Sequence, residues 1–139
     1  IRQESTFRKQ VKSHAGALGL MQVIPSTARK VSERFNIHLT EMKQMYQAKT
    51  NINIGVAYLH LLSKKFKSHP VLMAAAYNAG PKQVKKWLKG NKKEETDIWI
   101  ECLPWHETRN YLKNVLSFYA VYQFRLSNEP SIKDFMEKI

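Results

Sequence analysis

One carboxylate near the N-terminus could act as a catalytic acid. Glu4 is followed directly by Ser5, and the next acidic residue along the chain is Glu33. A glutamate transfers a proton to a leaving group only if it stays protonated near the working pH, and apolar surroundings achieve this by raising its pKa. Most glycosidases use a second carboxylate, yet Glu33 falls inside an ordinary amphipathic helical pattern. A conventional retaining pair of carboxylates is therefore not visible in the sequence, and Glu4 could also be simply a surface glutamate.

The other residue types that often carry chemistry form no recognisable site. The five histidines share no ligand-like spacing, and neither His-x-x-x-His nor Cys-x-x-Cys occurs. His106 follows Cys102 by four residues, but one such pair is a weak signal. No serine lies in a Gly-x-Ser-x-Gly sequence, which argues against a serine nucleophile. We therefore predict neither a metal nor another cofactor.

Three short motifs follow the Glu4-Ser5 pair along the chain. They are Gly19-Leu20-Met21-Gln22, Ala76-Tyr77-Asn78-Ala79-Gly80 and Glu107-Thr108-Arg109-Asn110-Tyr111. None is distinctive alone. Together and in this order, the four resemble the catalytic domain of the soluble lytic transglycosylases, which cut the glycan strands of bacterial peptidoglycan. The resemblance runs from about Ile1 to about Leu126.

The resemblance implies a mechanism that needs only one carboxylate. In the resembled family a single glutamate acts first as acid and then as base, and the N-acetyl group of the substrate stabilises the cation. The muramyl 6-hydroxyl then attacks the anomeric carbon and closes a 1,6-anhydro ring without water. Glu4 would carry both roles in cleaving the β-1,4 bond between N-acetylmuramic acid and N-acetylglucosamine.

The resemblance also implies a set of substrate-binding residues, most of which have a structural alternative. The set is Ser13, Met21, Gln22, Tyr77, Asn78, Glu107 and Tyr111. Met21 and Tyr77 could instead be core side chains, and Gln22 a buried amide. Glu107 could equally be a favourable charge at the N-terminus of its helix. We retain Glu107 as a binding residue and not as a nucleophile.

The apolar periodicity of the chain is mainly helical. Helices are expected from Pro25 to about Phe35, from about Val71 to Tyr77 and from about Glu107 to Leu126. The small residues between Lys12 and Val23 indicate a loop or a short hairpin. The pattern and the resemblance predict a mainly α, lysozyme-like domain of the goose-type or soluble-transglycosylase kind, with at most a very small β-hairpin or sheet.

Four expectations concern how individual side chains are placed. One helix should bury an apolar stripe made of Ile52, Val56, Leu59, Leu62 and Phe66. Thr50 or Asn51 would cap the start of that helix. The last long helix should turn an aromatic stripe toward the core, made of Tyr111, Val115, Phe118 and Tyr122. The single cysteine, Cys102, should be a small buried hydrophobic residue.

The chain carries a net charge of +12, and the excess is concentrated in its middle. Between Met42 and Lys93 there are eleven lysines and no acidic residue. Such a field attracts nucleic acid, an anionic membrane or an acidic wall polymer, although a solvated surface is the simpler interpretation. Val84, Trp87 and Leu88 recur among the lysines at helical spacing and are not interleaved for base stacking. No nucleic-acid partner is therefore expected.

The length of 139 residues predicts one catalytic domain, residues 1–139. Three residues before Glu4 cannot form a stable helix, so the chain looks clipped from a longer protein with a preceding helical region. No apolar run could span a bilayer, and no signal peptide is visible. The resemblance implies a bacterial periplasmic or cell-envelope protein, monomeric, acting on peptidoglycan glycan strands.

Three other functions remain open. A goose-type lysozyme would hydrolyse the same bond, although the motifs around Tyr77 and Glu107 favour transglycosylation. A non-catalytic module that binds the cell wall or nucleic acid would suit the charge, but it would not need the Glu4-Ser5 pair. A wall-cutting enzyme of a secretion or phage apparatus would share the chemistry and differ only in its context.

Overall fold

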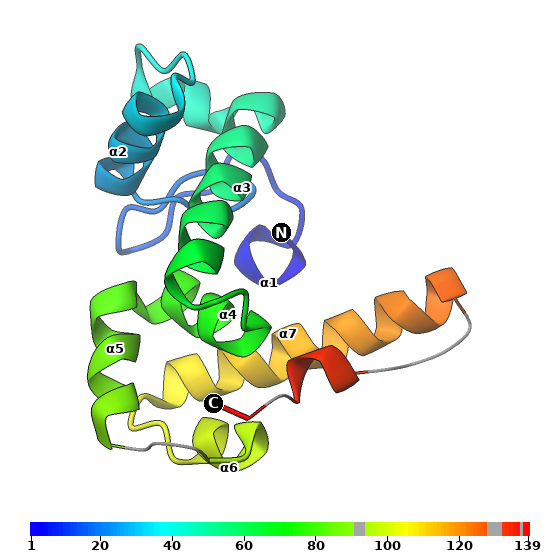
Figure 1. The fold of residues 1–139 in the computed structure, drawn as a ribbon. Coiled ribbons are helices and arrows are strands. Elements are labelled where there is room, and N and C mark those ends of the chain that lie inside the picture. The colour runs from blue at the N-terminus through cyan, green and yellow to red at the C-terminus, as the bar shows by residue number, and fades with distance from the viewer. Residues whose placement is uncertain (91–93, 128–131, 137) are drawn as a thin grey trace. The chain divides into compact units, whose positions relative to one another are not determined.

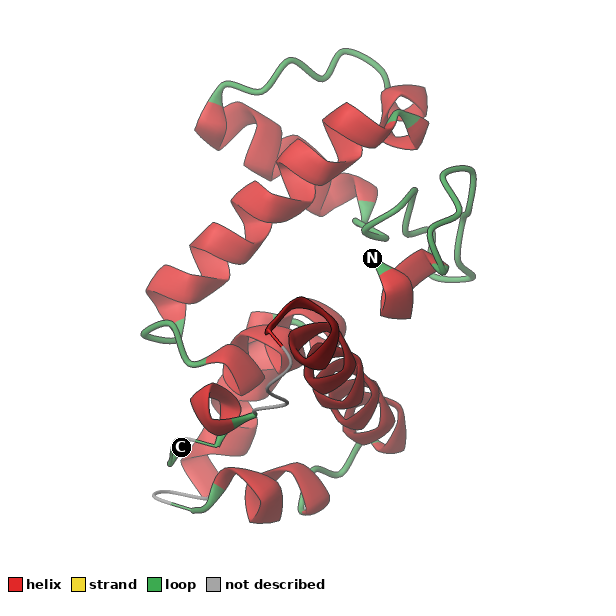
Figure 2. Ribbon diagram, turned by 90° about the vertical axis from the view of Figure 1, so that its right-hand side faces the viewer, coloured by secondary structure: helices red, strands yellow, loops and turns green. Residues whose placement is uncertain are grey.

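The computed structural model describes residues 1–90, 94–127, 132–136 and 138–139. Within these residues the regular elements are helices joined by loops, and no strand is present (Figure 2). The chain divides into two compact units, Ile1–Leu61 and Leu62–Ile139, and the long helix α3 (Ala48–Lys65) passes from one to the other. None of the helices in the described residues is long and apolar enough to cross a membrane.

The first unit contains three further helical elements, shown in Figure 1. They are α1 (Arg2–Ser5), α2 (Pro25–Phe35) and the 3-10 helix η1 (Met42–Tyr46). α2 begins and ends as predicted. Its first residue is proline because that ring fixes a helical φ and its missing N–H would have no partner at a helix start.

A loop of residues 6–24 joins α1 to α2 and forms part of the core of the first unit. It contains two isolated antiparallel bridges, Lys12 with Leu18 and Leu18 with Val23, which confirms the predicted loop or short hairpin. The N–H of Leu18 donates to the Val23 carbonyl at 3.1 Å, and the N–H of Val23 donates back at 3.2 Å. Residues 17–21 are all buried, so these backbone groups need partners inside the protein.

The predicted orientation of α3 is partly wrong. The helix begins at Ala48, so Asn51 lies inside it and neither Asn51 nor Thr50 is its cap. Val56, expected in the core, is 54% exposed, whereas Asn51 and Ile54 are fully buried. The buried side of this part of α3 is turned by roughly a quarter of a turn from the apolar stripe. The cause is a buried amide at Asn51, which a search for apolar residues does not find.

The regular elements of the second unit are also helices in its described residues. They are α4 (Pro70–Ala79), α5 (Pro81–Gly90), α6 (Thr96–Glu101), α7 (His106–Ser127) and the 3-10 helix η2 (Lys133–Phe135). α4 contacts α5, α7 and η2, and α6 contacts α7 (Figure 1). Gly80, with φ +87°, separates α4 from α5, and Pro81 opens α5.

Two predictions for the second unit are wrong. Tyr122 of the expected aromatic stripe is 42% exposed, while Leu112 and Thr108 in the first turns of α7 are buried. Figure 1 shows the reason, since the last turns of α7 extend beyond α4 and α6. Cys102, expected in the core, is exposed directly after the end of α6.

Candidate active site

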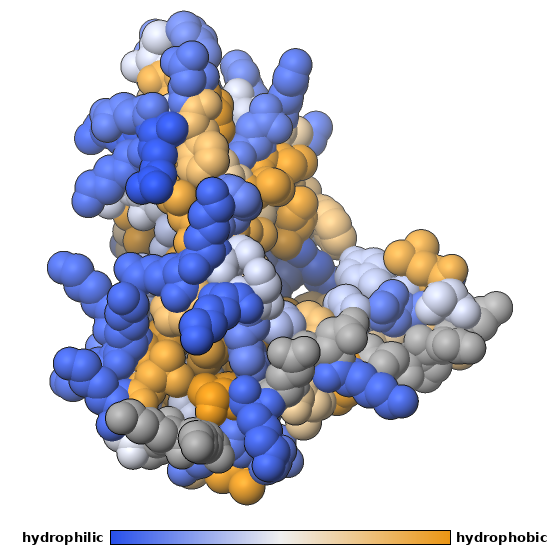
Figure 3. All heavy atoms as spheres, viewed as in Figure 1, coloured by the Kyte–Doolittle hydropathy of each residue, from blue (hydrophilic) through white to orange (hydrophobic). Residues whose placement is uncertain are grey.

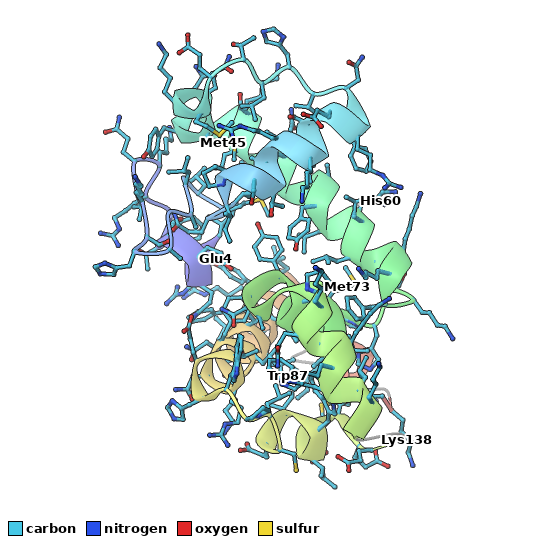
Figure 4. The ribbon with its side chains drawn as sticks, turned by 90° about the vertical axis from the view of Figure 1, so that its left-hand side faces the viewer. Glu4, Met45, His60, Met73, Trp87 and Lys138 are labelled. Atoms are coloured by element: carbon cyan, nitrogen blue, oxygen red, sulfur yellow. The ribbon has the colours of Figure 1, made fainter. Side chains whose placement is uncertain are left out.

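Glu4 lies half-buried on α1, a helix of four residues (Figure 4). The side chain of Ser5 anchors this helix: it is 2% exposed, and its Oγ donates to the Leu20 carbonyl at 2.8 Å. Ser5 thereby attaches the turn that carries Glu4 to the Gly19–Gln22 loop.

The backbone around this turn is strained. Thr6, which ends α1, and Phe7 have φ values of 49° and 63°, and Gln22 has φ 47°. Residues other than glycine pay about 1–2 kcal/mol to enter this left-handed region. Such strain persists only where surrounding contacts enforce it, and it is typical of functional sites. The strained residues here are Thr6 and Phe7, which follow the Glu4-Ser5 pair, and Gln22, which ends the loop to which the turn is attached.

The buried side-chain amide of Asn51 holds the same loop from the opposite side. Its Oδ1 accepts the N–H of Met21 at 2.7 Å, and its Nδ2 donates to the carbonyls of Leu18 and Met45 at 2.9 and 2.8 Å. Gly19, with φ +73°, permits this approach, because a Cβ there would collide with the Met45 carbonyl and the Asn51 amide. Asn51 thus links α3, η1 and the loop.

Met21 and Gln22 occupy different environments in this loop. Met21 is buried, and its side chain packs so tightly on α3 that a Cβ on Gly55 would collide with its sulfur. Gln22 is half-buried, and its Nε2 donates to the Gly19 and Val11 carbonyls at 2.7 and 3.2 Å. Both residues therefore shape the loop, whatever they contact in a substrate.

Two further side chains of the first unit, Ser13 and Tyr58, carry hydroxyl groups. The half-buried Ser13 closes a tight turn, since its Oγ accepts the N–H of Ala17 at 3.0 Å. That bond leaves the hydroxyl proton of Ser13 able to donate to another acceptor. Tyr58 follows Gly55 by three residues on α3, and burial raises the pKa of its phenol, which keeps the hydroxyl a neutral donor.

The second unit carries the remaining predicted site residues on α4 and α7. Asn78, in the last turn of α4, accepts a 2.8 Å hydrogen bond at its Oδ1 from the hydroxyl of Thr108, which is fully buried at the start of α7. Arg109 donates from Nη1 to the Glu101 carbonyl at the end of α6, at 3.1 Å. The Glu-Thr-Arg motif therefore fixes the start of α7 to two neighbouring helices.

The same start of α7 presents Glu107 to solvent, while Tyr77 on α4 and Tyr111 on α7 are half-buried. Glu107 lies in the first turn, where its charge is favourable to the helix dipole. The structure thus groups Glu4, Ser13, Met21 and Gln22 in the first unit, and Asn78, Glu107, Tyr77 and Tyr111 in the second. Among the described residues, no group of three or more His, Cys, Asp or Glu could hold a metal ion.

The chain matches known proteins over most of its length. Residues 1–100 match the sequence profile of the Transglycosylase SLT domain family. The chain belongs to this family. The soluble lytic murein transglycosylase of Escherichia coli K12 is 40% identical over 134 residues, which are 94% of this chain and 21% of that protein. The putative soluble lytic murein transglycosylase of Haemophilus influenzae is 36% identical over 92% of this chain and 22% of its own length.

Solved structures of related transglycosylases share the fold. An inactive Glu→Gln mutant of the lytic transglycosylase Slt from Pseudomonas aeruginosa is 41% identical, with a TM-score of 0.89 over 98% of this chain and 22% of that one. The 70-kDa soluble lytic transglycosylase of Escherichia coli gives a TM-score of 0.90 at 38% identity, over 98% of this chain and 22% of that chain. These matches confirm the mainly α, lysozyme-like fold. The chain spans about a fifth of the length of these relatives.

Three residues organise this SLT domain in ways that were not predicted from sequence, where Asn51 was expected only as a possible helix cap. Ser5 and Thr108 stand inside recognised motifs, so the motifs located them without showing that each makes a buried tertiary hydrogen bond. Asn51 lies outside every motif. Its only signal is a short polar amide inside a strongly apolar helical pattern, where a buried polar group requires partners.

Proposed function

We propose that this chain is the catalytic domain of a peptidoglycan lytic transglycosylase, comprising residues 1–139. It cleaves the β-1,4 bond between N-acetylmuramic acid and N-acetylglucosamine and leaves 1,6-anhydromuramic acid ends. The observation that carries the proposal is the attachment of the Glu4 turn to the Gly19–Gln22 loop through Ser5, in a chain of the SLT family. A half-buried carboxyl group held in this way suits a general acid.

In the proposed reaction the carboxyl group of Glu4 first donates its proton to the glycosidic oxygen, and the bond from that oxygen to the anomeric carbon breaks. The N-acetyl carbonyl of the muramic acid stabilises the positive charge, as in other substrate-assisted glycosidases. The Glu4 carboxylate then removes the proton of the muramyl 6-hydroxyl as that oxygen bonds to the anomeric carbon. Glu4 ends the cycle protonated, and no water is consumed.

The binding roles divide between the two units. Ser13 donates its free hydroxyl proton toward the N-acetyl group or the glycan, and Met21 and Gln22 line the glycan path. Tyr77, Asn78, Glu107 and Tyr111 contact the substrate from α4 and α7. The relatives are lytic murein transglycosylases, which supports a glycan-binding surface in this domain, and the inactive Glu→Gln mutant from Pseudomonas aeruginosa supports dependence on one glutamate.

We further propose that the domain works as a monomer in the periplasm or elsewhere in the bacterial cell envelope. The membrane-bound lytic murein transglycosylase D of Escherichia coli, 32% identical over 82% of this chain, supports an envelope location. Peptidoglycan glycan strands are the partner, and no nucleic acid and no cofactor is required.

Mass spectrometry of peptidoglycan digested by the chain tests the proposal directly. Transglycosylation gives fragments that are one water lighter than the fragments produced by hydrolysis. Fragments of the heavier mass would instead identify a lysozyme-like hydrolase, the alternative with the same bond specificity. Absence of any fragment from a folded protein would leave a wall-binding module without activity, and would contradict the proposal.

A further inference from the structure

One side of α5 carries only lysines. Lys82, Lys85, Lys86 and Lys89 are all exposed and recur at steps of three, one and three along the helix. At 3.6 residues per turn they share an arc of about 100° and extend over about 10 Å. We name this surface the α5 lysine face. Figure 3 shows hydrophilic side chains along the outer side of α5.

The opposite side of α5 fixes the helix in place. Val84 is fully buried, and the ring of Trp87 contacts the ring of Trp105 edge-on, with centroids 5.4 Å apart. Figure 4 labels Trp87 on this helix. The four lysines therefore extend from a helix whose rotation is set by packing.

This arrangement opposes the stability of the helix. Like charges three or four residues apart repel each other, and Lys82 in the first turn also opposes the helix dipole. Lys43, Lys113 and Lys138 each form an ion pair with a glutamate, but none of the four α5 lysines pairs with a carboxylate of the described residues. An anionic ligand would remove both penalties.

The residue types on the face indicate the kind of anion. Lysine is a flexible point charge, so a row of lysines suits separate charges whose spacing is not fixed. The face has no arginine for bidentate phosphate contacts and no aromatic ring for base stacking. A flexible polymer with separate carboxylates fits these features better than a nucleic acid does.

We infer that the α5 lysine face binds the carboxylates on the peptide side chains of intact peptidoglycan, at a surface additional to the residues proposed to bind the glycan. The inference rests on the proposed function for the identity of the polymer. It predicts that the domain is held on the wall by charge while the glycan is cut elsewhere on the molecule.

Co-sedimentation with insoluble peptidoglycan tests the inference without requiring turnover, so loss of binding and loss of cleavage are separate results. The variant replaces Lys82, Lys85, Lys86 and Lys89 by glutamine. The matched control replaces four exposed lysines of the first unit by glutamine: Lys9, Lys30, Lys43 and Lys49. Both variants lose four positive charges, and circular dichroism verifies that each is folded.

The face variant should bind about tenfold more weakly or worse, as expected from the loss of four exposed ion pairs, and the control should change much less. Conversion of the peptidoglycan carboxylates to neutral amides should weaken wild-type binding equally. Equal losses in both variants, or unchanged binding to the neutral wall, would overturn the inference. Equally tight binding of wild type to duplex DNA at the same salt concentration would show an unspecific polyanion surface, and would also overturn it.

A second inference rests on the Asn51 amide. A continuous path of contacts runs from Asn51 to the Met21 N–H and the Leu18 carbonyl, through the loop to the Leu20 carbonyl, and from there to Ser5 beside Glu4. Asn51 is fully buried, so nothing else can replace its hydrogen bonds. We propose that Asn51 is a positioning residue that sets the location of Glu4 by holding this loop, given the proposed function.

The variant Asn51→Asp keeps the shape of the side chain and changes its donors. Ionised aspartate can donate neither to Leu18 nor to Met45, while the protonated form restores one donor. The kcat on peptidoglycan fragments should fall tenfold or more with KM nearly unchanged, and the loss should shrink at lower pH, because burial raises the pKa of the introduced carboxyl. Ile54→Val, which lowers stability from a buried position on the same helix, should leave kcat unchanged.

Hydrogen exchange gives a readout besides activity. The amide protons of Leu18 and Val23, which are bonded to each other's carbonyls within the loop, should exchange faster in Asn51→Asp than in Ile54→Val, even if the protein proves to cleave nothing. Wild-type kcat for Asn51→Asp below its melting temperature, or an equal loss of kcat in Ile54→Val, would show that Asn51 has a structural role only. Unchanged exchange at Leu18 and Val23 would overturn the path itself.

Discussion

At the scale of single residues, Glu4 and Ser5 divide one task between them. Ser5 is buried and bonded to the Gly19–Gln22 loop, and its neighbour Glu4 is half-buried on the same turn. Because adjacent residues of a helix point in different directions, Ser5 can anchor the turn while Glu4 carries the proton in the proposed mechanism.

Replacement of Glu4 by glutamine should abolish most of the activity. The change keeps the size of the side chain and removes its transferable proton, so the rate should fall by roughly 10² to 10⁴ or more. Thermal unfolding should stay close to that of wild type. Glu33→Gln, an exposed position on α2, is the matched control and should retain full activity. Near-normal wall lysis by folded Glu4→Gln would remove Glu4 from the mechanism.

The effect of replacing Glu107 by glutamine distinguishes a catalytic role from a binding role for this residue. If it were a second catalytic carboxylate, Glu107→Gln would cost as much as Glu4→Gln, since retaining chemistry needs both groups. We expect a partial loss and an unchanged 1,6-anhydro product, because Glu107 is exposed in the first turn of α7. Steady-state rates with product mass spectrometry measure both quantities. A change of product to the hydrolysed sugar would contradict the binding role.

At the scale of elements, the loop of residues 6–24, which is buried over residues 17–21, depends on one close approach. Gly19 and Gly16 have similar φ values of 73° and 79°, but only at Gly19 would a Cβ collide with neighbouring groups. Gly16→Ala should therefore cost about 1–2 kcal/mol of stability, from backbone strain alone. Gly19→Ala should cost about 1–3 kcal/mol more, because it also overpacks the contact with Asn51. Equal losses in denaturant unfolding would show that the loop adapts easily.

The elements themselves were largely predictable, and their packing was less so. Pro25, Pro81 and Gly80 act through their own backbone restrictions, so α2, α4 and α5 begin or end where local sequence indicates. Which side of α3 is buried depends instead on Asn51, whose partners are 30 and 33 residues distant in the loop. No local pattern contains that information.

The candidate site was also only partly predictable from local sequence patterns. Motifs located Met21, Gln22 and Asn78, but each of these residues makes hydrogen bonds within the protein that spacing does not reveal. Only the coordinates show that Asn78 reaches Thr108, a contact between α4 and α7. The motifs thus singled out candidate residues, and the structure shows which hydrogen bonds hold these residues in place.

At the scale of the whole molecule, charge is the dominant property. The chain has 23 lysines and arginines against 11 acidic residues, so it attracts any polyanion over distances set by the ionic strength. For the proposed function this attraction concerns capture of the wall and not bond cleavage. The two steps should therefore respond differently to salt.

Salt should weaken lysis of intact peptidoglycan much more than cleavage of short soluble glycan fragments. Between about 0.01 M and 0.15 M salt the screening length falls from about 30 Å to about 8 Å, which removes long-range attraction but preserves contacts inside the site. Initial rates on both substrates across this range measure the difference, and the quadruple α5 variant should show a smaller salt response on intact wall than wild type. Equal sensitivity on both substrates would place the effect at the catalytic groups. In that case the positive charge would assist the reaction itself, and capture by the wall would need another explanation.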